Sequence, residues 1–187
     1  MFSLFYEVFM KIAIIGYSGS GKSTLARHIS KIMNIPVLHF DTVNWTFGWN
    51  ERDHSEQFNI VRDFLNKNSS WVIDGNYSKL FYEERMSSAD KIIFMNFNRF
   101  NCLFRAIKRF KKYKGSTRED MGEGCPEKLD VKFIKWILID GRNKGNKQRY
   151  RSIIKKYDSK VIIIKNQIQL NKLYKLIEQG GEYGKSL

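Results

Sequence analysis

Residues 16–23 read G-Y-S-G-S-G-K-S and fill the spacing G-x-x-x-x-G-K-S/T of a phosphate-binding loop. Glycines at this spacing let backbone N–H groups approach phosphate oxygens, the lysine can reach the terminal phosphates, and the serine hydroxyl can bind Mg²⁺. An apolar run precedes the loop, and S-T-L-A-R-H-I-S-K-I-M continues it as a helix whose N-terminus faces the bound anion. The residues expected to hold ATP are Gly16, Ser18, Gly19, Ser20, Gly21, Lys22, Ser23 and Thr24, with Ser23 also binding Mg²⁺.

Short apolar runs alternate with helical patterns along the rest of the chain. Nearly continuous apolar runs are typical of strands that are covered on both faces, and strand–helix alternation indicates a parallel sheet. We therefore expect an α/β fold, a P-loop NTPase three-layer sandwich with a five-stranded parallel sheet. The predicted strands are Lys11–Gly16, Pro36–Phe40, Trp71–Asp74, Lys91–Phe97 and Lys160–Lys165, and predicted helices surround Phe58–Leu65 and Phe133–Leu138.

Length and composition favour one domain. The chain has 187 residues, 42% hydrophobic and 14% aromatic, enough for one buried core. We expect residues 10–187 to form it and residues 1–9 to be an extension, since they lack the basic and cleavage-site signals of a signal peptide. Cys102 and Cys125 have no metal-ligand spacing, as expected of thiols in a reducing cytoplasm, and no run is long enough to span a bilayer.

Positive charge is concentrated in the second half of the chain. Residues 1–90 carry nine Lys or Arg and ten Asp or Glu, whereas residues 91–187 carry 24 and nine, for a net charge of +14 overall. The basic stretches 105–118 and 142–156 contain no acidic residue. Such stretches attract polyanions, either nucleotide phosphates or a nucleic-acid backbone.

Two carboxylates follow predicted strands. In an open parallel sheet the ligand crevice lies beyond the carboxyl ends of the strands, which is where Asp41 and Asp74 are expected. One carboxylate can order Mg²⁺ while the other accepts a proton from an attacking hydroxyl. We assign Asp74 to the metal together with Ser23, and Asp41 either to the base or to a turn cap.

The chain resembles the nucleoside-monophosphate kinase superfamily in its Walker loop, the D-G after the third run and the Arg-rich helix after the fourth. The strings H-F-D-T-V-N-W, W-V-I-D-G-N-Y-S and D-M-G-E-G-C-P-E-K-L-D are more closely similar to the FlaR-type "DNA topology modulation protein" group, which is related to adenylate kinase. The resemblance implies the sheet order 2-3-1-4-5.

A mobile lid is expected over residues 111–130. Arg105 and Arg109 match the arginines that open the lid of nucleotide kinases, and at four residues apart they share a helical face. Salt bridges or solvation are the alternative for each. Arg118 within the lid and Arg142 after the next helix are candidates to neutralise the transferring phosphoryl group, with a solvated cation as the alternative for Arg142.

The acceptor side departs from the adenylate-kinase pattern. After D-G, that pattern has an aromatic residue, a proline and an arginine, whereas this chain has Asn76, Tyr77 and Ser78. An AMP-type acceptor is therefore in doubt, and a neutral hydroxyl acceptor fits these residues at least as well. The expected acceptor-binding residues are Asp41, Trp45, Trp49, Asn76, Tyr77 and Arg85. The two tryptophans could stack on a base or ring, and packing within the core is the alternative for them.

Two functions follow from the sequence. The first is a Mg²⁺-dependent kinase that transfers the γ-phosphoryl group of ATP to a small molecule, with Lys22, Asp41, Asp74, Arg105, Arg109, Arg118 and Arg142 as its catalytic residues. The alternative is a nucleotide-dependent DNA-binding regulator, which the basic half would suit. We favour the kinase because a lid and paired carboxylates assemble a transfer site.

Overall fold

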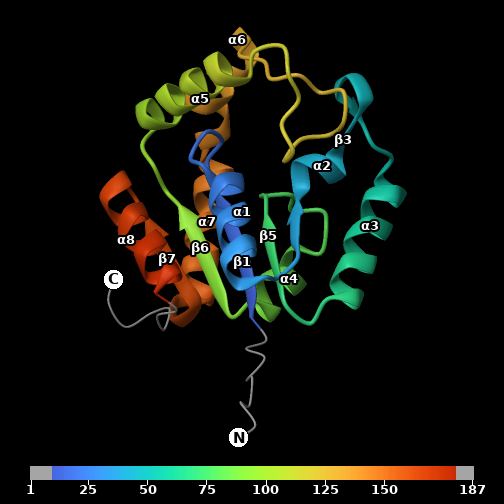
Figure 1. Ribbon diagram of the computed structural model, residues 1–187. Coiled ribbons are helices and arrows are strands. Elements are labelled where there is room, and N and C mark those ends of the chain that lie inside the picture. The colour runs from blue at the N-terminus through green and yellow to red at the C-terminus, as the bar shows by residue number, and fades with distance from the viewer. Residues whose placement is uncertain (1–9, 180–187) are drawn as a thin grey trace, which may run out of the picture.

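Five parallel strands form the central sheet of the computed structural model, which describes residues 10–179 (Figure 1). The strands are β1 (Lys11–Gly16), β2 (Val37–His39), β5 (Trp71–Asp74), β6 (Lys91–Met95) and β7 (Val161–Ile164), in the order β2-β5-β1-β6-β7. Numbered along the chain without the small hairpin β3–β4, this is the expected order 2-3-1-4-5. The extension expected at residues 1–9 lies outside the described residues.

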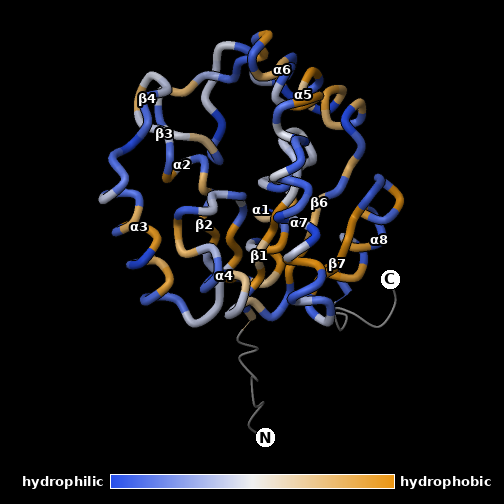
Figure 2. Tube along the Cα trace, turned by 180° about the vertical axis from the view of Figure 1, so that it is seen from behind, coloured by the Kyte–Doolittle hydropathy of each residue, from blue (hydrophilic) through white to orange (hydrophobic). Residues whose placement is uncertain are grey.

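Helices cover both faces of the sheet, as the apolar strands require. Every residue of β5 is buried, as are residues 12–16 of β1. Helix α1 (Lys22–Met33) packs on β1, β2 and β5 and contacts α8 (Gln167–Glu178), while α4 (Tyr82–Ser88) packs on β1. Seen from behind in Figure 2, hydrophobic residues are concentrated along the sheet strands, whereas much of α7 (Lys144–Lys156) is hydrophilic. The fold class expected from the sequence is confirmed.

A small excursion follows β2 on one side of the sheet. It consists of α2 (Phe40–Asn44), the antiparallel pair β3 (Trp45–Thr46) and β4 (Asn50–Glu51), and the short 3₁₀ helix η1 (Phe47–Trp49) between them. Helix α3 (His54–Lys67) then returns the chain to the sheet, capped at its N-terminus by Asp53. Periodicity located α3 but not these short elements, because two-residue strands carry no period.

A second excursion begins after β6. Helix α5 (Arg99–Tyr113) is followed by an irregular segment, residues 114–130, and then by α6 (Val131–Leu138) and η2 (Asp140–Arg142). After α7 and η3 (Asp158–Lys160), the chain enters β7. We call residues 114–130 the strap. Figure 1 shows the strap and α2 with the hairpin beyond the same end of the sheet as the phosphate-loop residues that follow β1.

The carboxyl ends of the strands meet at this end. Ile14 of β1 pairs with Asp74, and His39 of β2 pairs with Asp74 from the other side. Residues that follow the strands therefore converge, as the crevice rule for open parallel sheets requires. Within residues 10–179, no helix is both long and apolar enough to cross a membrane.

Candidate active site

The loop at residues 16–21 has the backbone that its glycines permit. Gly16 and Gly19 have φ of 139° and 77°, in the region that favours glycine. A Cβ on Gly16 would lie 2.5 Å from the Met95 carbonyl oxygen, and one on Gly19 would lie 2.5 Å from that of Cys102. Both positions therefore require glycine for space as well as conformation, and the loop is packed directly against β6 and α5.

Lys22 lies across the loop. Its Nζ donates a hydrogen bond to the Tyr17 carbonyl oxygen over 3.2 Å. Burial lowers the pKa of Lys22, and the neighbouring Asp41 and Asp74 carboxylates oppose this effect. The ammonium group is thus held at the cavity by the loop backbone.

Ser23 and Asp74 are brought together, as predicted. The Ser23 hydroxyl donates to Asp74 Oδ2 over 2.7 Å, and the other carboxylate oxygen contacts His39 Nδ1. Asp74 is only 4% exposed. Among the described residues, no group of three His, Cys, Asp or Glu could hold a metal ion. Mg²⁺ suits a site of this kind, because it uses one or two protein oxygens and completes its shell with phosphates and waters.

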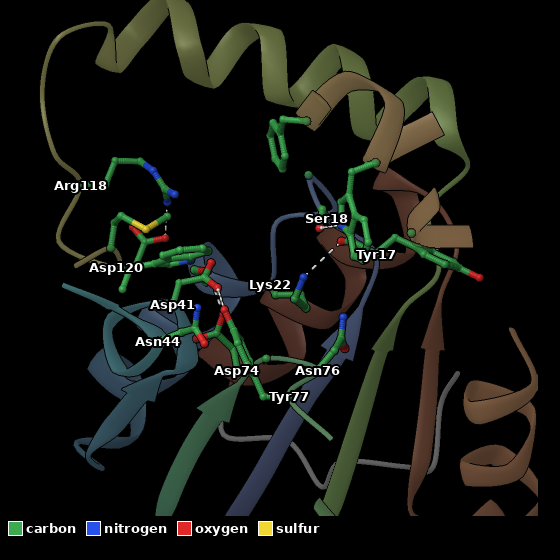
Figure 3. Close-up of a pocket in the computed structure, with 18 of the residues that line it drawn as sticks. Tyr17, Ser18, Lys22, Asp41, Asn44, Asp74, Asn76, Tyr77, Arg118 and Asp120 are labelled. Carbon is green, nitrogen blue, oxygen red and sulfur yellow. Dashed lines mark hydrogen bonds and ion pairs between the residues drawn. The ribbon is translucent and has the colours of Figure 1, made fainter. Parts of the chain in front are cut away.

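Asp41 occupies the opposite wall. It lies in α2 and accepts a hydrogen bond from the Tyr77 hydroxyl over 2.9 Å. Burial raises the pKa of Asp41, and the nearby Asp74 carboxylate raises it further. Burial and Asp41 likewise raise the pKa of Tyr77, so this phenol remains a donor. Figure 3 shows Asp41 and Tyr77 facing the cavity beside Asn44 and Asp74, with Lys22 across from them.

The Asn76 side chain is hydrogen-bonded to the backbone of the phosphate loop. Its Oδ1 accepts from the Gly16 N–H over 3.0 Å, and its Nδ2 donates to the Gly16 carbonyl oxygen over 2.5 Å. The side chain lines the cavity, but both ends of its amide are used. Its position therefore serves the start of the phosphate loop.

Three of the predicted arginines line the cavity, and each is already paired. Arg105 donates to the Ser20 carbonyl oxygen over 2.7 Å and also contacts Gln167. Arg109 and Arg118 donate to the Glu127 carboxylate over 2.9 Å and 2.6 Å, respectively. Arg118 also contacts Asp120, and Arg27 of α1 reaches the same carboxylate over 2.5 Å. The chain of ion pairs thus runs from α1 through the strap to α5.

Two predicted arginines and two loop residues lie off the cavity wall. Arg85, which was expected to bind the acceptor, is fully buried away from the cavity lining, and its guanidinium donates to the carbonyl oxygens of Leu80 and Tyr77. Arg142, a candidate for catalysis or a solvated cation, donates to the Phe97 carbonyl oxygen over 2.8 Å and lies over the Tyr17 ring, outside the cavity lining. These guanidiniums stabilise backbone carbonyls that strand and helix ends leave unpaired. Gly16 and the buried Ser20 hydroxyl also lie off the wall.

The strap closes over the cavity by packing on the β3–β4 hairpin. The Gly48 N–H donates to the Gly124 carbonyl oxygen over 3.1 Å, and the Cys125 thiol donates to the Thr46 carbonyl oxygen over 3.1 Å. Lys128 lies 4.0 Å above the Trp49 ring. The two excursions are therefore joined above the sheet end.

The resulting cavity has a volume of about 1630 Å³. This exceeds the 300–1,000 Å³ that is typical for one small ligand, so it has room for two. The phosphate-loop, strap and acceptor-side predictions meet here: Ser18, Gly19, Gly21, Lys22, Ser23, Thr24, Asp41, Trp45, Trp49, Asp74, Asn76, Tyr77, Arg105, Arg109 and Arg118 all line it.

Several wall residues were not singled out from the sequence. Trp136 donates to the Ser18 hydroxyl over 3.1 Å, and Arg149 of α7 lines the wall without a hydrogen bond or ion pair to any described residue. Asn44 and Gln57 line the acceptor side. The string N-W after Asp41 was the available signal for Asn44, whereas Gln57 and Arg149 look like ordinary polar helix residues in sequence.

Comparisons with known proteins identify the fold. No protein-family model and no curated protein sequence matches the chain. The solved structure of TT1252 from Thermus thermophilus matches with a TM-score of 0.53 at 14% identity, covering 91% of this chain and 95% of its own.

Two shikimate kinases also match with a TM-score of 0.50. One, from Acinetobacter baumannii in complex with shikimate, is 14% identical and covers 93% of both chains. The other, from Bacteroides thetaiotaomicron, is 18% identical and covers 91% of this chain and 96% of its own. At these identities the likeness establishes the fold of P-loop kinases for nearly the whole chain, and nothing finer.

Proposed function

We propose that the protein is an ATP-dependent phosphotransferase that moves the γ-phosphoryl group of ATP to a small-molecule acceptor. The contact between Ser23 and Asp74 beside Lys22 carries this proposal, because it places a hydroxyl, a carboxylate and an ammonium group where a triphosphate and Mg²⁺ are held in P-loop enzymes. Asp41 faces this group across a cavity with room for a second ligand. Shikimate kinases of the same fold act on a small molecule, which agrees with this reading.

The donor half follows from the loop. Backbone N–H groups of residues 18–23 cradle the phosphates, and Lys22 is released from the Tyr17 carbonyl oxygen to meet them. Ser23 and Asp74 would hold Mg²⁺, which neutralises charge on the transferring phosphoryl group. Asp74 is oriented for this task by its contact with His39.

The acceptor half centres on Asp41. A carboxylate whose pKa is raised by burial is a better proton acceptor at neutral pH than an exposed one. Tyr77 occupies one Asp41 oxygen, which leaves the other for an attacking hydroxyl. Arg109 and Arg118 approach the phosphoryl group when they exchange Glu127 for phosphate oxygens.

Residues 111–130 act as the lid in this proposal. They comprise the end of α5 and most of the strap, and they carry Arg118, Asp120 and Glu127. Closure of the lid on the hairpin excludes water from the transferring group. We infer no nucleic-acid function, because that alternative depends on net charge alone and basic charge also accompanies ATP binding.

ATP binding and turnover test the proposal. Lys22→Ala removes a charged donor and should weaken binding of Mg²⁺–ATP by about 10- to 100-fold in calorimetry, corresponding to about 1.5–3 kcal/mol. Asp74→Asn should abolish acceptor-dependent ADP release. Lys31→Ala, an exposed lysine on the same helix, is the matched control and should leave both measurements unchanged.

Two results would contradict the proposal. One is ATP affinity that is the same in Lys22→Ala as in the parent protein. The other is ADP release no faster than bare ATP hydrolysis across a broad panel of nucleosides, monophosphates, sugars and hydroxy acids. A steep salt dependence of DNA binding that survives Lys22→Ala would favour the regulator instead.

A further inference from the structure

The acceptor wall of the cavity contains a side-chain amide with no hydrogen-bond partner among the described residues. Asn44, at the end of α2, is 5% exposed and lines the cavity. Its side chain makes no hydrogen bond to any residue within 10–179, although its backbone carbonyl oxygen accepts from the Arg52 N–H. Its amide atoms are not among the fully buried side-chain atoms of the described residues that lack a partner, so the amide opens onto the cavity. Figure 3 shows this side chain next to Asp41, on the same wall. Asn44 is therefore free to bind a ligand that lies against Asp41.

Gln57 adds a second amide to the wall. It is 4% exposed, and its Nε2 donates to the Arg52 carbonyl oxygen over 2.7 Å. This bond fixes the amide group and leaves Oε1 without a partner in the described structure. The two amides can donate to and accept from hydroxyl groups, which are themselves both donors and acceptors.

Several cations of the same wall are already paired. Arg52 donates to the Val43 carbonyl oxygen over 2.8 Å and pairs with Glu56. Arg118 is held by two carboxylates, and Lys128 covers one face of Trp49. Phosphate recognition normally uses a free guanidinium fork or several lysines. Lys79, an exposed residue close to Tyr77 in sequence, and Arg149 also line the cavity without a carboxylate partner among the described residues, so these two cations could bind a phosphate on the acceptor. The unpaired polar group beside Asp41 itself is the neutral amide of Asn44.

Two indoles complete the wall. Trp45 and Trp49 meet edge to face with ring centroids 5.6 Å apart. Trp49 has φ of 65°, a left-handed conformation that is strained for a large residue. Its backbone N–H donates to the Cys125 sulfur over 3.4 Å. Strain of this kind persists where the surroundings impose it and gathers at binding sites. Here it fixes the position of an aromatic ring at the cavity.

We propose that the acceptor is an uncharged polyhydroxylated compound with an apolar face, of the nucleoside or sugar type. The inference depends on the phosphotransferase function proposed above. One hydroxyl lies at the free oxygen of Asp41, neighbouring hydroxyls bind the amides of Asn44 and Gln57, and the apolar face lies on an indole. The hydroxyl oxygen forms a bond to the γ-phosphorus, the bond from that phosphorus to ADP breaks, and the hydroxyl proton passes to Asp41.

Arg149 identifies the competing chemistry. It lines the cavity from α7 and pairs with no carboxylate among the described residues. An anionic acceptor would be bound through Arg149, whereas an uncharged one is bound through Asn44. Substitution of Arg149 should therefore affect an anionic acceptor, and substitution of Asn44 an uncharged one.

A panel of matched compounds tests the class. Nucleosides, free hexoses and cyclitols, and the monophosphate of each are supplied with Mg²⁺–ATP to the full-length protein, and ADP release is measured. We expect turnover above ATP hydrolysis with at least one uncharged compound, and a kcat/KM at least about tenfold lower for its monophosphate, since the added dianion meets Asp41 and Glu51. Comparison of the nucleosides with the hexoses and cyclitols shows which of these hydroxyl compounds is the acceptor.

Asn44→Leu provides the residue test. We expect the KM for the acceptor to rise by about 3- to 10-fold, the equivalent of one neutral hydrogen bond, with the KM for ATP unchanged. We also expect an unchanged Tm, because the Asn44 side chain makes no hydrogen bond within the described residues; a structural asparagine would lower it. Asn66→Ala, an exposed asparagine on α3, is the control.

The outcomes separate this inference from the proposed function. A monophosphate used more efficiently than its uncharged parent, or an acceptor KM that responds to Arg149→Ala and not to Asn44→Leu, would overturn the acceptor class and leave the phosphotransferase intact. If the parent protein does not bind Mg²⁺–ATP, the proposed phosphotransferase function is itself wrong.

Discussion

Replacement of Asn76 tests how the phosphate loop is held. The side chain makes two hydrogen bonds to Gly16, one to each backbone group, at 3.0 Å and 2.5 Å. Asn76→Ala removes both. With about 0.5–1.5 kcal/mol for each neutral hydrogen bond, the free energy of unfolding should fall by about 2 kcal/mol. Because Gly16 begins the loop, Mg²⁺–ATP binding should also weaken, by about 3- to 10-fold.

Asn76→Asp should be worse at neutral pH than Asn76→Ala. The aspartate can still accept from the Gly16 N–H, but its second oxygen faces the Gly16 carbonyl oxygen where an N–H had donated. The proton is bound more tightly in the folded state, since a protonated carboxyl restores the donor. The stability of this variant is therefore greatest at low pH and is lost as the pH rises through the folded-state pKa.

Urea unfolding at pH 4 and pH 7.5, with calorimetric titration of an ATP analogue, measures these effects. Asn66→Ala, which removes an exposed asparagine amide, is the control and should change neither quantity. An Asn76→Ala variant within about 0.5 kcal/mol of the parent protein, or an Asn76→Asp variant that loses stability on acidification relative to the parent, would refute the reasoning.

Two further substitutions act on the cavity. Asp41→Asn should raise the free energy of unfolding at pH 7 but not at pH 3. Burial and Asp74 raise the pKa of Asp41 in the folded state, so its ionisation destabilises the fold at pH values above the unfolded pKa of 3.8. Acceptor-dependent ADP release should fall by about 100-fold or more in the same variant. A parallel shift at both pH values in urea titrations would contradict this assignment. Glu127→Gln should lower the free energy of unfolding by about 2 kcal/mol, since charged hydrogen bonds to Arg109 and Arg118 are lost. The same substitution should tighten Mg²⁺–ATP binding in calorimetry. Weaker ATP binding would count against the proposal that these arginines leave Glu127 to bind phosphate oxygens.

The sheet was predictable because its strands are apolar on both faces. The predicted bounds of Lys11–Gly16 and Trp71–Asp74 agree with β1 and β5, and each of the other three strands is two residues shorter than predicted. The hairpin β3–β4 and α2 escaped the prediction because their side chains are held by tertiary contacts. Cys125, for example, lies 79 positions from the Thr46 carbonyl oxygen that its thiol contacts.

The donor side of the site was predictable for a different reason. The phosphate loop has a fixed spacing, and Asp74 follows a strand, so the position of each is set by local rules. The cations were harder to predict, because the sequence does not reveal which guanidinium a carbonyl or carboxylate will occupy. Arg85 and Arg142 bind backbone carbonyl oxygens, and Asn76 binds Gly16, so three residues expected at ligands serve the scaffold.

The strap is joined to the rest of the protein by ion pairs or hydrogen bonds at three places, so we expect it to open as one cooperative unit. Asp120 is tied to Arg27 of α1, Glu127 to Arg109 of α5, and Gly124 to Gly48 of the hairpin. A segment held at several points cannot fray residue by residue, so its backbone amides are exposed to solvent together or not at all. In hydrogen exchange, the Gly48 and Glu127 amides should therefore share one protection factor, although 79 positions separate them in the chain.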